Sequence, residues 1–147
     1  MAKYPKMPPL TLSQQFYGLK STYRNILSCG IIREVLTCIM EIKPSENSDT
    51  YQVKIRYQLG HPPRIWLLDP PMQQRNGEYP KHLYLQNADA AGHQCLCLYY
   101  PGYNEWHGNK LLSTTIVPWI SAWLNTYEYW LITGEWQYPE SPHGGVK

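Results

Sequence analysis

The segment TTIVPWISAWLNTYEYWLITGEW, residues 114–136, decides the fold. Its large apolar side chains recur at spacings of three and four residues, which is the period of one face of a helix. These residues are Ile116, Trp119, Ile120, Trp123, Leu124, Tyr127, Trp130 and Leu131. The pattern predicts a long helix whose aromatic face packs on the rest of the domain, with its tryptophans in the core.

The ends of this helix carry their own signals. Thr114 or Thr115 can cap the first turn, and Pro118 falls in that turn, where a missing N–H group costs little. Gly134 suits the exit because glycine readily adopts the left-handed conformation that often ends a helix.

Alternating segments upstream of the helix predict strands. In TYQVKIRYQL, residues 50–59, apolar and polar side chains alternate, as on a strand with one face toward water. The segment from Ile31 to Ile42 also alternates, apart from Glu34, and is interpreted as one long strand. Turn residues lie between the two segments, in KPSENSD at residues 43–49, so an antiparallel hairpin is expected.

The remaining elements complete an α+β domain. Apolar residues at helical spacing, from Leu12 to Tyr23, predict a short N-terminal helix. RIWLL, residues 64–68, predicts a third strand, and the prolines of residues 69–81 predict a loop. The expected order is a helix, a three-stranded meander, a loop, a cysteine-containing segment and the aromatic helix.

Composition and charge limit the function classes. The chain has 147 residues, 43% hydrophobic and 14% aromatic, so it can bury a core without metals or disulfides. Its formal net charge of +2 is not gathered into a basic run, which argues against nucleic acid as a partner. We expect one domain over residues 1–147, with an ordered core at about residues 12–136 and a flexible tail.

No export signal or membrane span is expected. The N-terminal MAKYPKMPPL lacks the apolar core of a signal peptide, and no apolar run reaches membrane-spanning length. A cytoplasmic protein without a membrane partner is therefore expected. In that compartment its four cysteines, Cys29, Cys38, Cys95 and Cys97, are expected to be thiols rather than disulfides.

The segment that carries candidate chemistry is HLYLQNADAAGHQCLCLYYPGYNEW, residues 82–106. In a first interpretation His93, Cys95 and Cys97 project from one face of a strand and bind zinc with a further histidine. Two thiolates one residue apart on a strand stand roughly 7 Å apart, however, which is too far for tetrahedral zinc. No metal is therefore expected.

Two other interpretations compete with the metal site. In one, CLCLYY, residues 95–100, is a buried apolar segment in which both cysteines act as small hydrophobic residues. In the other, one thiol is a nucleophile on an irregular, partly exposed segment, and the second thiol is buried. The residue pattern alone leaves both open.

Several motifs in order resemble one protein family. They are DTYQVKIRYQLGHPPRIWLL from residue 49, HLY at residues 82–84, LCLYYP at residues 96–101, Trp106, and TIVPWISAWLNTYEYWLITGEW at residues 115–136. In this combination the chain resembles the small stand-alone bacterial relatives of ubiquitin-conjugating enzymes in short type II CBASS operons, which defend against phage with cyclic oligonucleotides. The resemblance runs from about Leu12 to Trp136.

The resemblance implies a fold and an activity. The fold is the ubiquitin-conjugating one, an antiparallel meander sheet with an N-terminal helix and a long C-terminal helix. The activity is an acyl transfer in which Cys97 forms a thioester with the C-terminus of a companion cGAS-like nucleotidyltransferase and promotes its activity. No cofactor is implied.

The family's site residues carry over in part. Cys97 falls on the reactive cysteine, and His82 on the position of the histidine that opens a His-Pro-Asn motif. The proline and asparagine of that motif are absent, which leaves Asn87 as a candidate amide donor to the oxyanion.

Two questions stay open at the level of sequence. No Gly-rich run follows a predicted strand, so either another protein activates the carboxyl group or the adduct forms without adenylation. The alternative to an enzyme is a non-catalytic binding module that clamps or stabilises the nucleotidyltransferase.

Overall fold

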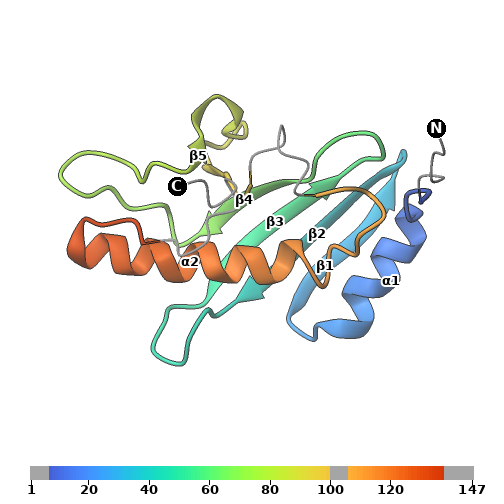
Figure 1. The fold of residues 1–147 in the computed structure, drawn as a ribbon, viewed down its shortest axis with the longest axis horizontal. Helices are drawn as coiled ribbons and strands as arrows, with labels where there is room; N and C mark the ends of the chain where they lie inside the picture. Colours follow the sequence, from blue (N-terminus) through green and yellow to red (C-terminus); the bar gives the residue numbers. More distant parts are fainter. Residues whose placement is uncertain (1–6, 100–105, 138–147) are drawn as a thin grey trace, which may run out of the picture.

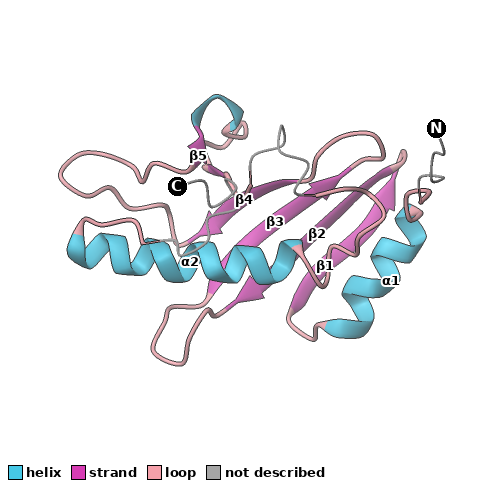
Figure 2. Ribbon diagram, in the orientation of Figure 1, coloured by secondary structure: helices cyan, strands magenta, loops and turns pink. Residues whose placement is uncertain are grey.

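The computed structural model describes residues 7–99 and 106–137 of the chain. Two helices and a six-stranded sheet make up this part of the molecule (Figures 1 and 2). The elements are α1 Leu12–Thr22, β1 Ile26–Ile32, β2 Val35–Ile42, β3 Tyr51–Tyr57, β4 Arg64–Asp69, β5 Leu83–Tyr84, the 3-10 helix η1 Leu85–Asn87, β6 Cys95–Leu96, and α2 Ile116–Thr133. The predicted α+β class is confirmed.

The sheet is antiparallel throughout, with strand order β1-β2-β3-β4-β6-β5. In Figure 1, α2 lies across one face of the sheet, and α1 lies beside the β1 edge. The two short strands β6 and β5 extend the sheet beyond β4. They bring the predicted cysteine segment into the sheet.

The core lies between α2 and the sheet. Alternate side chains of β2 and β3 point into it because a strand turns successive residues to opposite faces. On the helix side, Trp123 and Leu124 are fully buried. The sheet residues that face them are Leu36, Cys38, Met40, Ile42, Tyr51, Val53, Ile55 and Tyr57.

The predicted long strand from Ile31 to Ile42 is wrong. It is the end of β1, a two-residue turn and β2, and Arg33 and Glu34 in the turn have φ values of 51° and 63°. Two consecutive left-handed residues form the type I′ turn, whose twist matches that of a hairpin. Glu34, interpreted as an imperfection in a strand, therefore marks a turn, and the meander has four strands rather than three.

The signals at the helix ends are confirmed in part. Thr11 caps α1 through a reciprocal pair of bonds with Gln14. Gly134 ends α2 with a φ of 83°, and its N–H donates to Trp130. Thr115 is the N-cap of α2, but its hydroxyl donates to the Leu111 carbonyl at 2.6 Å instead of capping the helix.

The aromatic residues of α2 are mostly core, as predicted. Trp123 is fully buried and Trp130 is 9% exposed, whereas Trp119 is only partly buried. Trp66 is also buried, but on the opposite sheet face, because it pairs in register with Lys54 while its neighbours Ile65 and Leu67 face the core.

Two expectations concern the limits of the domain. In the described ranges, neither helix combines the length and apolarity that a membrane crossing requires. The predicted flexible tail falls mainly on residues 138–147, which lie outside the described residues.

Candidate functional site

The cysteine segment begins as a buried strand. Strand β6 lies between β4 and β5, with Cys95 opposite both Trp66 and Tyr84. Cys97 follows directly, and its backbone N–H donates to the His82 carbonyl at 3.0 Å. The segment is therefore regular up to Leu96 and leaves the strand at Cys97.

Both thiols of this segment are buried. Cys95 is 1% exposed and Cys97 is 7% exposed. The pairing with Trp66 places Cys95 on the sheet face away from α2, and burial raises its pKa. The expectation that one thiol is exposed and the other buried is thus wrong, because Cys97 is buried although it follows the end of the strand.

The thiol of Cys97 has polar neighbours. It donates to the Tyr99 carbonyl at 3.6 Å, and the Tyr84 hydroxyl donates to the same carbonyl at 3.0 Å. Burial raises the pKa of Tyr84, and a hydrogen bond with the Cys97 side chain raises it further. Tyr84 is thus a protonated donor that shares the Tyr99 carbonyl with the candidate nucleophile.

A cavity of about 130 Å³ adjoins this pair. Tyr84 and Tyr99 line it, as do Leu96 and Leu98 on either side of Cys97. Its other walls come from Pro62, Pro63, Arg64, Ile65 and Asn87. It is a small, mixed polar and apolar space lined by Tyr84 and by both chain neighbours of Cys97.

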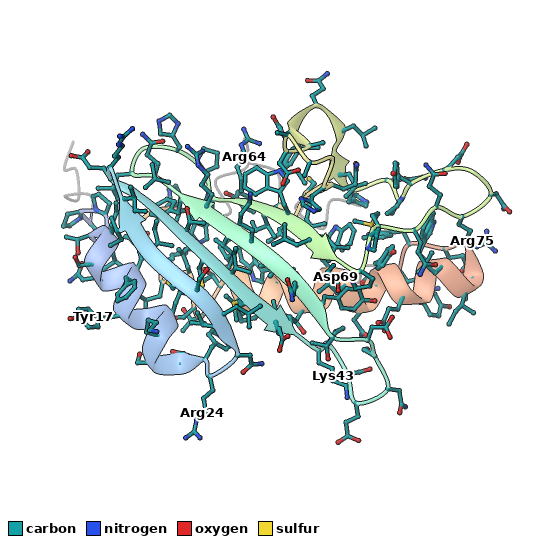
Figure 3. The ribbon with its side chains drawn as sticks, turned by 180° about the vertical axis from the view of Figure 1, so that it is seen from behind. Tyr17, Arg24, Lys43, Arg64, Asp69 and Arg75 are labelled. Atoms are coloured by element: carbon teal, nitrogen blue, oxygen red, sulfur yellow. The ribbon has the colours of Figure 1, made fainter. Side chains whose placement is uncertain are left out.

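Two residues of that cavity come from separate elements. Arg64 begins β4 and is labelled in Figure 3, and its guanidinium carbon lies 5.8 Å from the centre of the Tyr84 ring. Asn87 ends η1 and accepts a hydrogen bond from the Trp66 indole through its backbone carbonyl. Asn87 therefore lines the cavity together with Tyr84, and its backbone carbonyl is held by the Trp66 indole.

His82 is connected to Cys97 through the backbone. Its carbonyl accepts hydrogen bonds from the Cys97 N–H and, at 3.1 Å, from the Trp123 indole. Its imidazole is half-buried and lies against Trp136, with ring centres 5.2 Å apart. The structure thus places His82 and Cys97, the two residues carried over from the resemblance, opposite each other through a backbone hydrogen bond. Trp123 of α2 donates to the same carbonyl.

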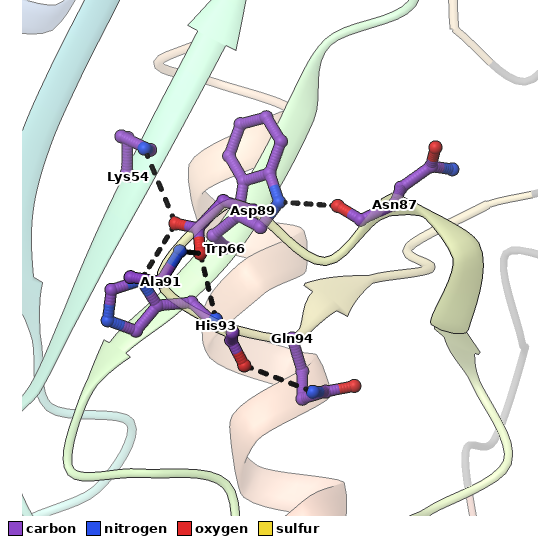
Figure 4. Close-up of polar contacts among 8 residues, drawn as sticks. Lys54, Trp66, Asn87, Asp89, Ala91, His93 and Gln94 are labelled. Carbon is purple, nitrogen blue, oxygen red and sulfur yellow. Dashed lines mark hydrogen bonds and ion pairs between the residues drawn. The ribbon is translucent and has the colours of Figure 1, made fainter.

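His93, the third residue of the zinc interpretation, is part of a loop anchor (Figure 4). Its Nδ1 lies 2.7 Å from an Asp89 carboxylate oxygen, and Lys54 lies 3.6 Å from the same carboxylate. Asp89 also accepts from the backbone N–H groups of Ala91 and His93. Within the described residues, 7–99 and 106–137, no group of three or more His, Cys, Asp and Glu side chains is arranged to hold a metal ion.

Sequence reasoning missed Tyr84 as a partner of Cys97. The available signal was its place in the HLY motif, two residues after His82. That spacing puts both side chains on one side of an extended segment, but it does not reveal which strand lies opposite. The pairing of β5 with β6 supplies this information.

Comparison with known proteins gives one family. Residues 15–144 match the family described as Type II CBASS E2 protein. No curated protein matches the chain. Since the match covers most of the chain and agrees with the α+β fold, this chain belongs to the Type II CBASS E2 family, whose members are ubiquitin-conjugating-like proteins associated with CBASS.

Proposed function

We propose that this protein carries an acyl group on Cys97, as a thioester with the C-terminus of a companion cGAS-like nucleotidyltransferase, and thereby promotes that partner's activity in anti-phage defence. Membership of the Type II CBASS E2 family supports the class of reaction and the kind of partner. The observation that carries the choice of residue is that the Cys97 thiol and the Tyr84 hydroxyl donate to the same Tyr99 carbonyl, and that Tyr84 and Tyr99 line a cavity.

The other cysteine of the segment is less suited to the reaction. A thiol reacts as its thiolate, and burial raises the pKa of Cys95, which disfavours that form. Cys95 is therefore interpreted as a small buried residue of the strand.

Sulfur suits the proposed chemistry. A thioester has less resonance stabilisation than an amide, so attack by an amine proceeds downhill once the amine is aligned. The protein then has to position the reactants and stabilise the developing charge. In this proposal, His82 holds the segment before β5 against Cys97 through its carbonyl, and no metal or organic cofactor takes part.

The 7% exposure of Cys97 favours a second candidate function. A protein with this fold can bind the nucleotidyltransferase and stabilise it without any covalent step. In that case Cys97 is a buried structural residue, and loss of its thiol leaves the complex and its activity intact.

Intact-protein mass spectrometry distinguishes the two functions. The chain is co-expressed with the cGAS-like nucleotidyltransferase of its operon as wild type, Cys97→Ala and the matched control Cys95→Ala. We expect an adduct one water lighter than the two chains together, cleaved by excess thiol, in wild type and Cys95→Ala but absent from Cys97→Ala. Co-purification without an adduct in all three forms would reject the acyl carrier and support the binding module.

A further inference from the structure

The Tyr99 carbonyl oxygen accepts hydrogen bonds from two side chains. The Tyr84 hydroxyl lies 3.0 Å from it and the Cys97 sulfur 3.6 Å from it. Two donors on one acceptor leave both donor groups beside each other. The arrangement suits a protonated thiol, because the S–H group has an acceptor.

Loss of the thiol proton changes what this arrangement requires. The sulfur then carries a negative charge and faces a carbonyl oxygen, which is itself partly negative. A thiolate needs a donor at short range, and hydrogen bonds to charged groups are the strong ones. The Tyr84 hydroxyl can supply it by rotating about its C–O bond from the Tyr99 carbonyl to the sulfur.

We propose that Tyr84 stabilises the Cys97 thiolate by donating its hydroxyl hydrogen to the sulfur, both when the sulfur attacks an acyl donor and when it leaves. This assignment rests on the proposed function of Cys97 and adds a residue to it. Tyr84 would occupy the role of charge-stabilising donor at a site whose sequence lacks the asparagine of the His-Pro-Asn motif.

The acyl group moves in two steps, first to Cys97 and then to an amine. The Cys97 thiol first loses its proton to water, and the thiolate sulfur then forms a bond to the carbonyl carbon of an activated acyl donor, an acyl adenylate or another thioester, whose leaving group departs with its electron pair. An amine nitrogen then forms a bond to that carbon, the sulfur–carbon bond breaks, and the sulfur takes the electron pair while the amine proton passes to water. Tyr84 keeps its own proton throughout, because its pKa is raised.

Other titratable groups surround the pair. Arg64 of β4 lies over the Tyr84 ring, and Cys95 of β6 pairs with Tyr84. Tyr99 follows Cys97 in the chain, and His82 lies opposite Cys97 through a backbone hydrogen bond. Tyr84→Phe keeps the ring on which Arg64 lies, so this variant removes the hydroxyl alone.

The test is a direct titration of the thiol. The ¹³Cβ shift of Cys97, assigned with Cys97→Ser, is followed by NMR against pH in wild type, Tyr84→Phe and Tyr23→Phe. We expect Tyr84→Phe to raise the Cys97 pKa by about one unit, which lowers the thiolate fraction near neutral pH about tenfold. Tyr23→Phe is the matched control, since its hydroxyl also donates to a backbone carbonyl, that of Ser113, far along the chain from Cys97.

A second variant covers the case in which Tyr84→Phe does not fold. Replacement of Tyr84 by 3-fluorotyrosine keeps the hydroxyl and makes it a stronger donor, so the Cys97 pKa should fall. An unchanged Cys97 pKa in Tyr84→Phe, or in the fluorinated protein if the first is unfolded, would overturn the proposal.

Adduct formation provides the functional readout. Tyr84→Phe should form the adduct about tenfold more slowly near neutral pH and recover as the pH rises above the thiol pKa, whereas a purely structural defect would persist at every pH. The titration needs no partner protein. It therefore still decides whether Tyr84 stabilises the Cys97 thiolate if the wild-type protein forms no thioester adduct.

Discussion

Gly134 shows how a single residue sets the end of the aromatic helix. Its φ of 83° is open to glycine and strained for other residues. A Cβ atom there would lie 2.5 Å from Nη1 of Arg75, whose Nε donates to the Leu131 carbonyl in the last turn. Figure 3 shows Arg75 beside this end of α2. The position therefore requires glycine for its backbone conformation, and an added Cβ would also displace the Arg75 guanidinium.

We expect Gly134→Ala to lower the free energy of unfolding by about 1–2 kcal/mol, measured by urea denaturation. Gly30→Ala is the control, because Gly30 lacks a positive φ and an added Cβ meets no atom within 4 Å. It should change the free energy by less than about 0.5 kcal/mol. Equal losses in both variants would contradict the steric argument.

At the scale of elements, the loop from η1 to β6 covers the outer face of the sheet. Asp89 anchors it through His93 and Lys54, and the Trp66 indole donates to Asn87 at 2.7 Å (Figure 4). The hydrogen bond and charge of His93 hold the pKa of Asp89 at about 2. This loop connects the HLY segment to Cys97, so its anchor helps to position the candidate site.

The anchor predicts a pH dependence with a definite sign. The Asp89 pKa is lower in the folded protein than its ordinary value of about 4, so the carboxylate stabilises the loop above that value. This stabilisation is lost as the pH falls from about 4 through about 2. We expect the indole N–H resonance of Trp66 to shift in this pH window in wild type but not in Asp89→Asn, as measured by NMR.

A control separates this effect from general acid unfolding. Asp49→Asn removes an exposed carboxyl group from the loop between β2 and β3 and should leave the Trp66 titration unchanged. A Trp66 shift that persists in Asp89→Asn would show that another group controls the loop.

At the scale of the whole molecule, α2 joins the core to the site. Trp123 is fully buried between the helix and the sheet, stacks at 5.6 Å on Tyr127, and donates its indole N–H to the His82 carbonyl. The same carbonyl accepts from the Cys97 backbone. Packing of the long helix is therefore coupled to the position of the candidate nucleophile.

We expect Trp123→Phe to lower the free energy of unfolding by about 1–3 kcal/mol, because it loses a buried hydrogen bond and part of a packed ring. It should also slow adduct formation on Cys97. Trp130→Phe, a similar ring change in a buried residue of the same helix, should reduce stability without slowing the adduct. Equal adduct rates in both variants would argue against the coupling.

The sequence by itself determined the elements whose pattern is periodic. The apolar stripe from Ile116 to Leu131, the alternation of β3 and Gly134 each have a local cause, because helix and strand periods and left-handed caps depend on neighbouring residues. Motif order also gave the family. By contrast, the type I′ turn is formed by Arg33 and Glu34 rather than by the glycine or asparagine that usually marks such a turn. The sequence pattern therefore predicts one strand where the structure has a hairpin.

Only the tertiary structure decided what surrounds Cys97. The two-residue strands β5 and β6 are too short for a recognisable period, and their pairing is a contact between distant parts of the chain. That pairing puts Tyr84 opposite Cys95, and beside it the Cys97 N–H donates to the His82 carbonyl, which also accepts from Trp123 of α2. The identity of the candidate thiol was thus readable from a local motif, whereas its burial and its donor arise from long-range packing.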